Sequence, residues 1–251
     1  MKEAIIYLLA IAAAEVITII IQPVWGMACH ILVLAAIILH SALASRQTQQ
    51  RLILSLALVP LVRVISLSMP LSNIPQVWWY PIMYAPLLVA AIIVARILGL
   101  RAKDVDLGFR LFPLQLAVAL SGFVFGVAEY LILSPEPVVN EFTWQEVWLP
   151  ALFFVVCTGF VEEFIFRGVM QRTAVEVFGW WGIVYVSLLF AILHLGHYPA
   201  NPPLSYCDVL FVFVIALLFG WVVKKTGSLL GVILAHGITN MILYLVAPFF
   251  F

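Results

Sequence analysis

Six polar or ionisable side chains are concentrated in three apolar segments toward the C-terminal end of the sequence: Glu162, Glu163, Arg167, His194, His236 and Asn240. Glu163 and Arg167 are four residues apart with the acid first, which is the spacing of an ion pair on one helix face. Glu162 is turned by ~100° from Glu163 about the same helix, so it faces a different neighbour. The pattern predicts a structural role for Glu163 and a chemical role for Glu162.

The two histidines have helical partners of their own. Phe190 and His194 are four residues apart, as are His236 and Asn240. Each pair therefore lies on one helix face and can point into a shared space between helices. A single histidine in an apolar helix is more often a packed core residue, and asparagine often bonds a neighbouring helix. The concentration of such groups in three of the last four apolar segments favours a site, because ionisable residues are costly inside a membrane.

Peptide-bond hydrolysis is the chemistry that this set of residues suits. It needs a base that activates a water molecule and donors that stabilise the oxyanion. A carboxylate in a low-dielectric cavity is suited to act as the base, so we assign that role to Glu162, with His194 holding the same water. His236 and Asn240 would donate to the oxyanion. The sequence contains no GxSxG or HExxH motif and no cysteine with an evident histidine partner.

The motifs also resemble those of a known family, the CPBP intramembrane proteases, which include CAAX endoproteases and the bacterial Abi proteins. Three motifs carry the resemblance, in this order: EExxxR over 162–167, FxxxH over 190–194 and HxxxN over 236–240. The similarity covers about residues 146–248, and Leu107–Arg110 resembles the family's upstream loop. It implies a glutamic-type endopeptidase that cleaves membrane-associated or lipidated peptides and proteins, classically just after a prenylated cysteine. We expect Glu163, Arg167 and Phe190 to support the site.

A zinc site is the close alternative. Glu162, His194 and His236 would be a catalytic zinc set with one position left for water. His197 adds an HxxH pattern with His194. We expect no metal and no other cofactor, with His197 in a loop at the outer interface.

Two functions without proteolysis are further alternatives. In a carrier, Glu15, Arg63 and Glu129 could form a relay with Glu162. Carriers are commonly built from inverted repeats, and the two halves of this sequence show no such symmetry. A membrane scaffold would bind a partner and would not need the carboxylate of Glu162.

Nine apolar segments would position these residues: 4–22, 27–44, 52–69, 78–99, 113–133, 147–170, 180–196, 208–223 and 228–249. The composition is 65% hydrophobic and 10% charged, with a mean hydropathy of +1.18, which is typical of membrane proteins. We therefore predict an all-α, polytopic transmembrane helix bundle of about eight or nine spans. Five spans belong to an N-terminal part, 1–133, and the rest to a catalytic membrane domain, 146–248.

The basic residues predict the orientation of the bundle. With the N-terminus in the cytoplasm, the loops on that side contain all Lys and Arg residues except Arg63 and Arg167, and the opposite loops contain none. The net charge of zero gives no indication of a nucleic-acid partner. The expected partners are membrane lipid and a peptide or protein substrate, and the expected location is a bacterial plasma membrane. No sequence feature sets the oligomeric state.

The depth of His194 does not fit a simple arrangement of these spans. At ~1.5 Å per residue, Glu162 lies ~15 Å from Arg172 along its helix, whereas His194 lies ~22 Å from Gly179. The seventh span must tilt or begin deeper, or the chain after Arg172 must re-enter the membrane.

Overall fold

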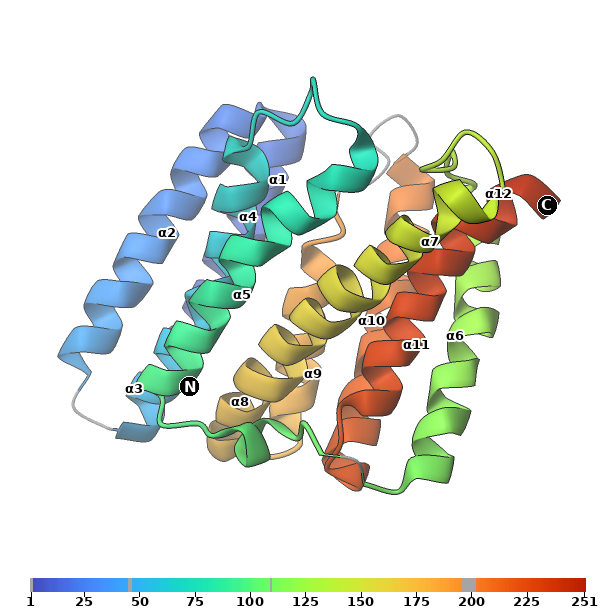
Figure 1. The fold of residues 1–251 in the computed structure, drawn as a ribbon. Coiled ribbons are helices and arrows are strands. Elements are labelled where there is room, and N and C mark those ends of the chain that lie inside the picture. The colour runs from blue at the N-terminus through green and yellow to red at the C-terminus, as the bar shows by residue number, and fades with distance from the viewer. Residues whose placement is uncertain (1, 45–46, 109, 196–201) are drawn as a thin grey trace.

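The structure, a computed structural model, describes four stretches of the chain: 2–44, 47–108, 110–195 and 202–251. Arg46, Phe109 and His197 lie outside these described residues. Within them every regular element is a helix, which confirms the predicted all-α fold. Figure 1 shows the helices side by side, with the two ends of the chain near opposite ends of the bundle.

The N-terminal half contains two long helices, a divided span and a fourth span. Its elements are, in order, α1 (Lys2–Ile20), α2 (Pro23–Leu43), α3 (Gln47–Leu56), α4 (Leu58–Ser68), the 3-10 turn η1 (Gln76–Trp78) and α5 (Trp79–Ile97). The third predicted span is thus divided between α3 and α4. Pro60 explains the division, because proline has no N–H to donate to the carbonyl four residues earlier.

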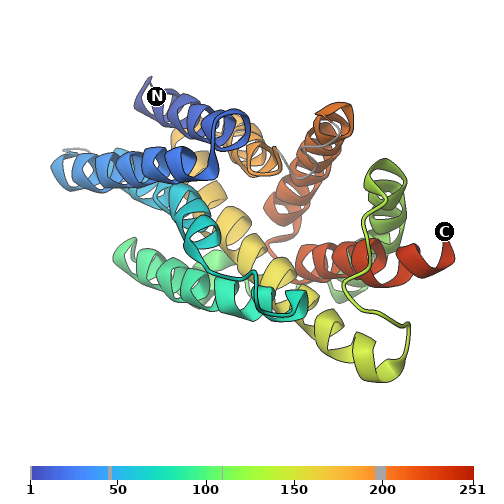
Figure 2. The same ribbon diagram turned by 90° about the horizontal axis from the view of Figure 1, so that it is seen from above.

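The C-terminal half is organised around one 35-residue helix, Trp144–Phe178. After the 3-10 turn η2 (Ala102–Val105), its elements are α6 (Phe112–Leu133), α7 (Trp144–Phe153), the π-helical segments η3 (Phe154–Glu162) and η4 (Phe164–Met170), α8 (Gln171–Phe178), α9 (Trp181–Ile192), α10 (Pro202–Thr226), α11 (Leu230–Met241), the π-helical η5 (Ile242–Val246) and α12 (Ala247–Phe250). Figure 2 shows the 35-residue helix crossing the middle of the bundle, with the N-terminal helices on one side and α6, α10 and α11 on the other.

Eight helical segments in the described part of the chain are long and apolar enough to cross a membrane. They correspond to eight of the nine predicted spans. The exception is 180–196, where α9 has only 12 residues. At ~1.5 Å per residue this helix is ~18 Å long, which is well short of a hydrocarbon core of ~30 Å. The described helices therefore agree with the predicted bundle of about eight or nine spans, and α9 is the short helix among them.

The depth of His194 is explained by the length of the preceding helix. The predicted sixth span ended at 170, but α8 continues the helix to Phe178. This end lies ~9 Å beyond Arg172 at ~1.5 Å per residue. Because α9 starts from that level, the ~22 Å from Gly179 to His194 is matched by ~24 Å from Glu162 to Phe178 along the preceding helix. His194 and Glu162 accordingly line the same cavity.

The helix α11 carries His236 and Asn240 and packs closely between α6 and η3. A Cβ atom added to Gly122 of α6, or to Gly159 of η3, would collide with a backbone carbonyl of α11. Small residues allow such close approach between membrane helices. The glycines therefore bring α11 against the segment that carries the paired glutamates.

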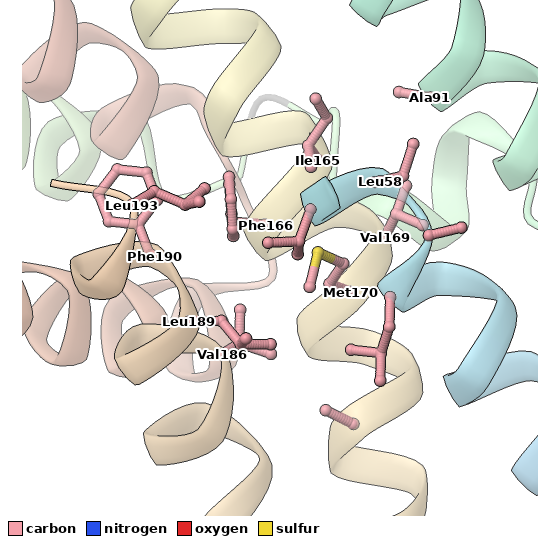
Figure 3. Close-up of a cluster of buried hydrophobic side chains, with 14 of the residues drawn as sticks. Leu58, Ala91, Ile165, Phe166, Val169, Met170, Val186, Leu189, Phe190 and Leu193 are labelled. Carbon is pink, nitrogen blue, oxygen red and sulfur yellow. The ribbon is translucent and has the colours of Figure 1, made fainter. Parts of the chain in front are cut away.

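The two halves of the chain share a buried apolar core. Leu58 and Ala91 of the N-terminal helices belong to the same cluster as Met170 of η4 and Leu189 of α9. Figure 3 shows these side chains gathered between the translucent ribbons of the two halves. The helices that carry the predicted catalytic residues are therefore held in place by the N-terminal half as well.

Candidate active site

A cavity of about 320 Å³ lies inside the bundle and is lined by both halves of the chain. Its lining includes all four residues that the sequence analysis proposed as catalytic: Glu162, His194, His236 and Asn240. The three proposed supporting residues line it too: Glu163, Arg167 and Phe190. The fold thus brings the three motifs to one cavity.

The ion pair predicted between Glu163 and Arg167 is present. Nη1 of Arg167 donates to Oε1 of Glu163 at 3.0 Å, and both side chains are buried. The same oxygen accepts from Nδ1 of His236 at 2.9 Å. Glu163 therefore holds a histidine as well as the arginine, and the spacing within one helix could not reveal this second partner.

Glu162 faces both His236 and a residue of the N-terminal half. Its Oε2 lies 3.8 Å from Nε2 of His236. Its Oε1 accepts a hydrogen bond from the hydroxyl of Tyr84, on α5. The sequence analysis missed Tyr84, because a tyrosine in an apolar span gives no sign of which helix it will face.

The backbone around the paired acids is π-helical rather than α-helical. In a π-helix the hydrogen bonds run from i to i+5, and such turns are frequent at functional sites. The wider turn changes the faces predicted from α-helical geometry. Glu162 and Glu163 were expected to face different neighbours; instead both lie against His236. Each acid nevertheless has a partner that the other lacks, Tyr84 for Glu162 and Arg167 for Glu163, so the predicted difference in neighbours is present although His236 is shared.

Phe190 connects the three charged or aromatic groups around it. Its ring lies 5.0 Å from that of His194 and 6.0 Å from that of His236, between ring centroids. The guanidinium carbon of Arg167 stands 4.6 Å from the centroid of the same ring. Phe190 thus packs against both imidazoles and provides an aromatic face for the buried cation.

His194 lies just beyond the C-terminal end of α9. Its Nδ1 donates to the carbonyl of Phe190 at 3.0 Å. A neutral imidazole that donates from Nδ1 has Nε2 as its accepting nitrogen. This tautomer suits a residue that accepts a hydrogen from water.

Asn240 is oriented by a residue that the sequence analysis did not include. Its Nδ2 donates to Oγ1 of Thr158 at 2.8 Å, and Thr158 in turn donates to the carbonyl of Phe154 at 2.6 Å. A carboxamide has two N–H donors. One is used on Thr158, so Asn240 can offer a single further N–H to the cavity.

The three candidate zinc ligands do not converge as a metal site requires. Among the described residues, no group of three or more His, Cys, Asp or Glu side chains is arranged to hold a metal ion. The arrangement does not fit zinc bound by Glu162, His194 and His236, and independence from metal remains a prediction.

Comparison with known proteins agrees with the motifs. Residues 142–242 match the family model described as type II CAAX prenyl endopeptidase Rce1-like. No curated protein and no solved structure matches the chain. The matched region contains the three motifs and every residue of the proposed catalytic set. Among the residues that the structure describes, eight helices could cross a membrane. The chain is therefore an integral membrane protein that carries, over residues 142–242, a domain of the Rce1-like type II CAAX prenyl endopeptidases, a family of peptidases.

Proposed function

We propose that the chain is an intramembrane endopeptidase in which Glu162 activates the attacking water. The observation that carries this proposal is the position of the Glu162 carboxylate in a cavity inside the bundle, one oxygen held by Tyr84 and the other facing His236. A fixed carboxylate with one oxygen directed toward the reaction space is what a general base needs.

In the proposed reaction, Glu162 takes a proton from the water as its oxygen attacks the carbonyl carbon of the peptide. His194 accepts a hydrogen bond from the second O–H of that water, and it takes this proton from the new carboxylic acid after the C–N bond has broken. The tetrahedral intermediate then breaks its C–N bond, and the proton held by Glu162 goes to the leaving amine. The products are a new carboxylate and a new amine, and no further reactant is consumed.

Two donors would stabilise the oxyanion of the intermediate. Asn240 has one N–H that is not used on Thr158. His236 already donates from Nδ1 to Glu163, so it can donate from Nε2 only as an imidazolium. The two adjacent carboxylates supply the negative charge that this form needs.

The other walls of the cavity support a substrate with an apolar portion. Several lining residues come from one face of α10: Phe211, Val212, Ile215, Ala216 and Phe219. We propose that the substrates are membrane-associated or lipidated peptides or proteins. We further propose that the protein acts in a bacterial plasma membrane. Its N-terminus would lie in the cytoplasm, because the loops predicted on that side contain all Lys and Arg residues except Arg63 and Arg167.

Comparative proteomics of membranes tests this proposal. Cells that express the wild-type chain should contain cleaved forms of particular membrane proteins or peptides. These forms should be missing, and their precursors enriched, in cells that express Glu162→Gln at the same level. Identical peptide profiles in the two strains would contradict a proteolytic function.

A further inference from the structure

A buried cluster of ionisable residues lies in the N-terminal half, outside the matched peptidase domain. Arg63 of α4 donates from Nε and Nη2 to the two carboxylate oxygens of Glu15 of α1, each at 2.6 Å. Nε2 of His30, on α2, lies 3.2 Å from Oε1 of the same carboxylate. The side chains of Glu15 and His30 are fully buried. Three helices therefore fix the direction of one guanidinium group.

This guanidinium also contacts the C-terminal half beside the proposed active site. Nη2 of Arg63 donates to the carbonyl of Leu193 at 2.8 Å. Leu193 follows the last residue of α9 and directly precedes His194. The last carbonyls of a helix lack partners within the helix, and inside a membrane they need another donor. Arg63 supplies that donor and itself lines the cavity.

The position of His194 depends on this end of α9. The amide of Leu193 bonds Phe190 at 3.2 Å, and the amide of His194 bonds Ala191 at 2.9 Å. Both bonds run over three residues, the tight type that closes helix ends, where fraying is usual. A hydrogen bond from another helix would hold such a terminal turn in a fixed position.

We infer that Arg63 is a positioning residue of the active site: oriented by Glu15 and His30, it fixes the Leu193 carbonyl and so sets where His194 stands in the cavity. This inference rests on the proposed function. It also assigns Glu15 and Arg63 a structural role instead of a role in a proton relay, because the two side chains form an ion pair with each other.

The test uses a paired variant, Glu15→Gln with Arg63→Met, since replacing Arg63 alone would strand a buried carboxylate. The matched control is Arg51→Met with Glu176→Gln, which removes another interhelical pair, of 3.0 Å, that does not line the cavity. In the test variant, amide hydrogen exchange over residues 190–195 should rise about tenfold. Its kcat should fall about tenfold with KM nearly unchanged, because small misplacements of catalytic groups are costly. The control should match wild type in both.

A double-mutant cycle separates positioning from general stabilisation. In a His194→Ala background, the paired variant should cause no further loss of kcat. An undiminished further loss, or wild-type exchange and kcat in the paired variant itself, would overturn the inference. A wild-type chain without any peptidase activity would instead overturn the proposed function. The exchange measurement would then decide alone whether Arg63 holds this segment.

Discussion

Two buried glutamate–arginine pairs lie beside the proposed active site, and they differ in how far apart their members are in the sequence. Glu163 and Arg167 are four residues apart on one helix. Glu15 and Arg63 are 48 residues apart on two helices. The local pair contacts one histidine of the site directly, whereas the long-range pair bonds the backbone next to the other histidine.

The difference shows that residues from two parts of the chain position the groups of this site. The matched region contains the residues proposed to react and the local pair. The helices before residue 142 lie outside the matched region, and they supply the long-range pair and also Tyr84. We therefore expect changes in the matched domain to abolish activity or folding, and changes in the N-terminal helices to reduce the rate by smaller factors.

The largest effect is expected at Glu162, the acid with no arginine partner. Glu162→Gln should lower kcat by ~10²–10⁴, the usual contribution of a general base. The melting temperature should stay close to that of wild type, because the amide has almost the volume of the carboxyl group. Both are measurable on purified protein with a peptide found by the proteomic comparison. Wild-type turnover by this variant would end the glutamate mechanism.

Arg167→Ala should damage the fold rather than the chemistry alone. Removing one member of a buried pair costs ~3–5 kcal/mol, and here it leaves Glu163 with His236 in place of two cationic partners. Arg51 is a control, since its pair with Glu176 is partly exposed and should contribute ~0.2–1 kcal/mol. Thermal unfolding in detergent would measure both variants. Equal destabilisation by Arg51→Ala and Arg167→Ala would show that the Glu163–Arg167 pair contributes no more to stability than a partly exposed pair does.

Asn240→Ala should reduce kcat by ~10²–10³ while KM changes little, because it removes a donor to the oxyanion. Thr158→Val should have a smaller effect on kcat, since it removes only the group that orients the amide. Steady-state kinetics on the same peptide would compare them. A large increase in KM with an unchanged kcat would assign Asn240 to substrate binding instead.

Tyr84→Phe should lower kcat by about tenfold, the effect of losing one hydrogen bond to a charged group. Tyr185→Phe is the matched control: its hydroxyl donates to the carbonyl of Ala4 at 2.8 Å, and the residue does not line the cavity. Turnover should therefore be unaffected by the control. The same loss in both variants would mean that a tyrosine hydroxyl matters here only for general stability.

Much of this arrangement could be predicted from the sequence, because helical periodicity and four-residue spacing are properties of a single helix. The features that could be predicted in this way are the fold class, the Glu163–Arg167 pair and the residues that meet in the cavity. The bond from Arg63 to Leu193 could not be predicted, since 130 residues separate its members and only the tertiary packing brings them together. Nor could hydropathy show where α9 stops, because the apolar sequence continues past the last helical turn.

Removal of metal tests the central claim, that a carboxylate and not a metal ion activates the water. Purified wild-type protein should be chelated exhaustively, analysed for bound metal and assayed on its peptide substrate, with zinc added back in a parallel sample. We expect unchanged turnover, no stoichiometric metal and no gain from added zinc. Loss of activity on chelation that zinc alone restores would contradict it, and would make Glu162, His194 and His236 candidates for metal ligands.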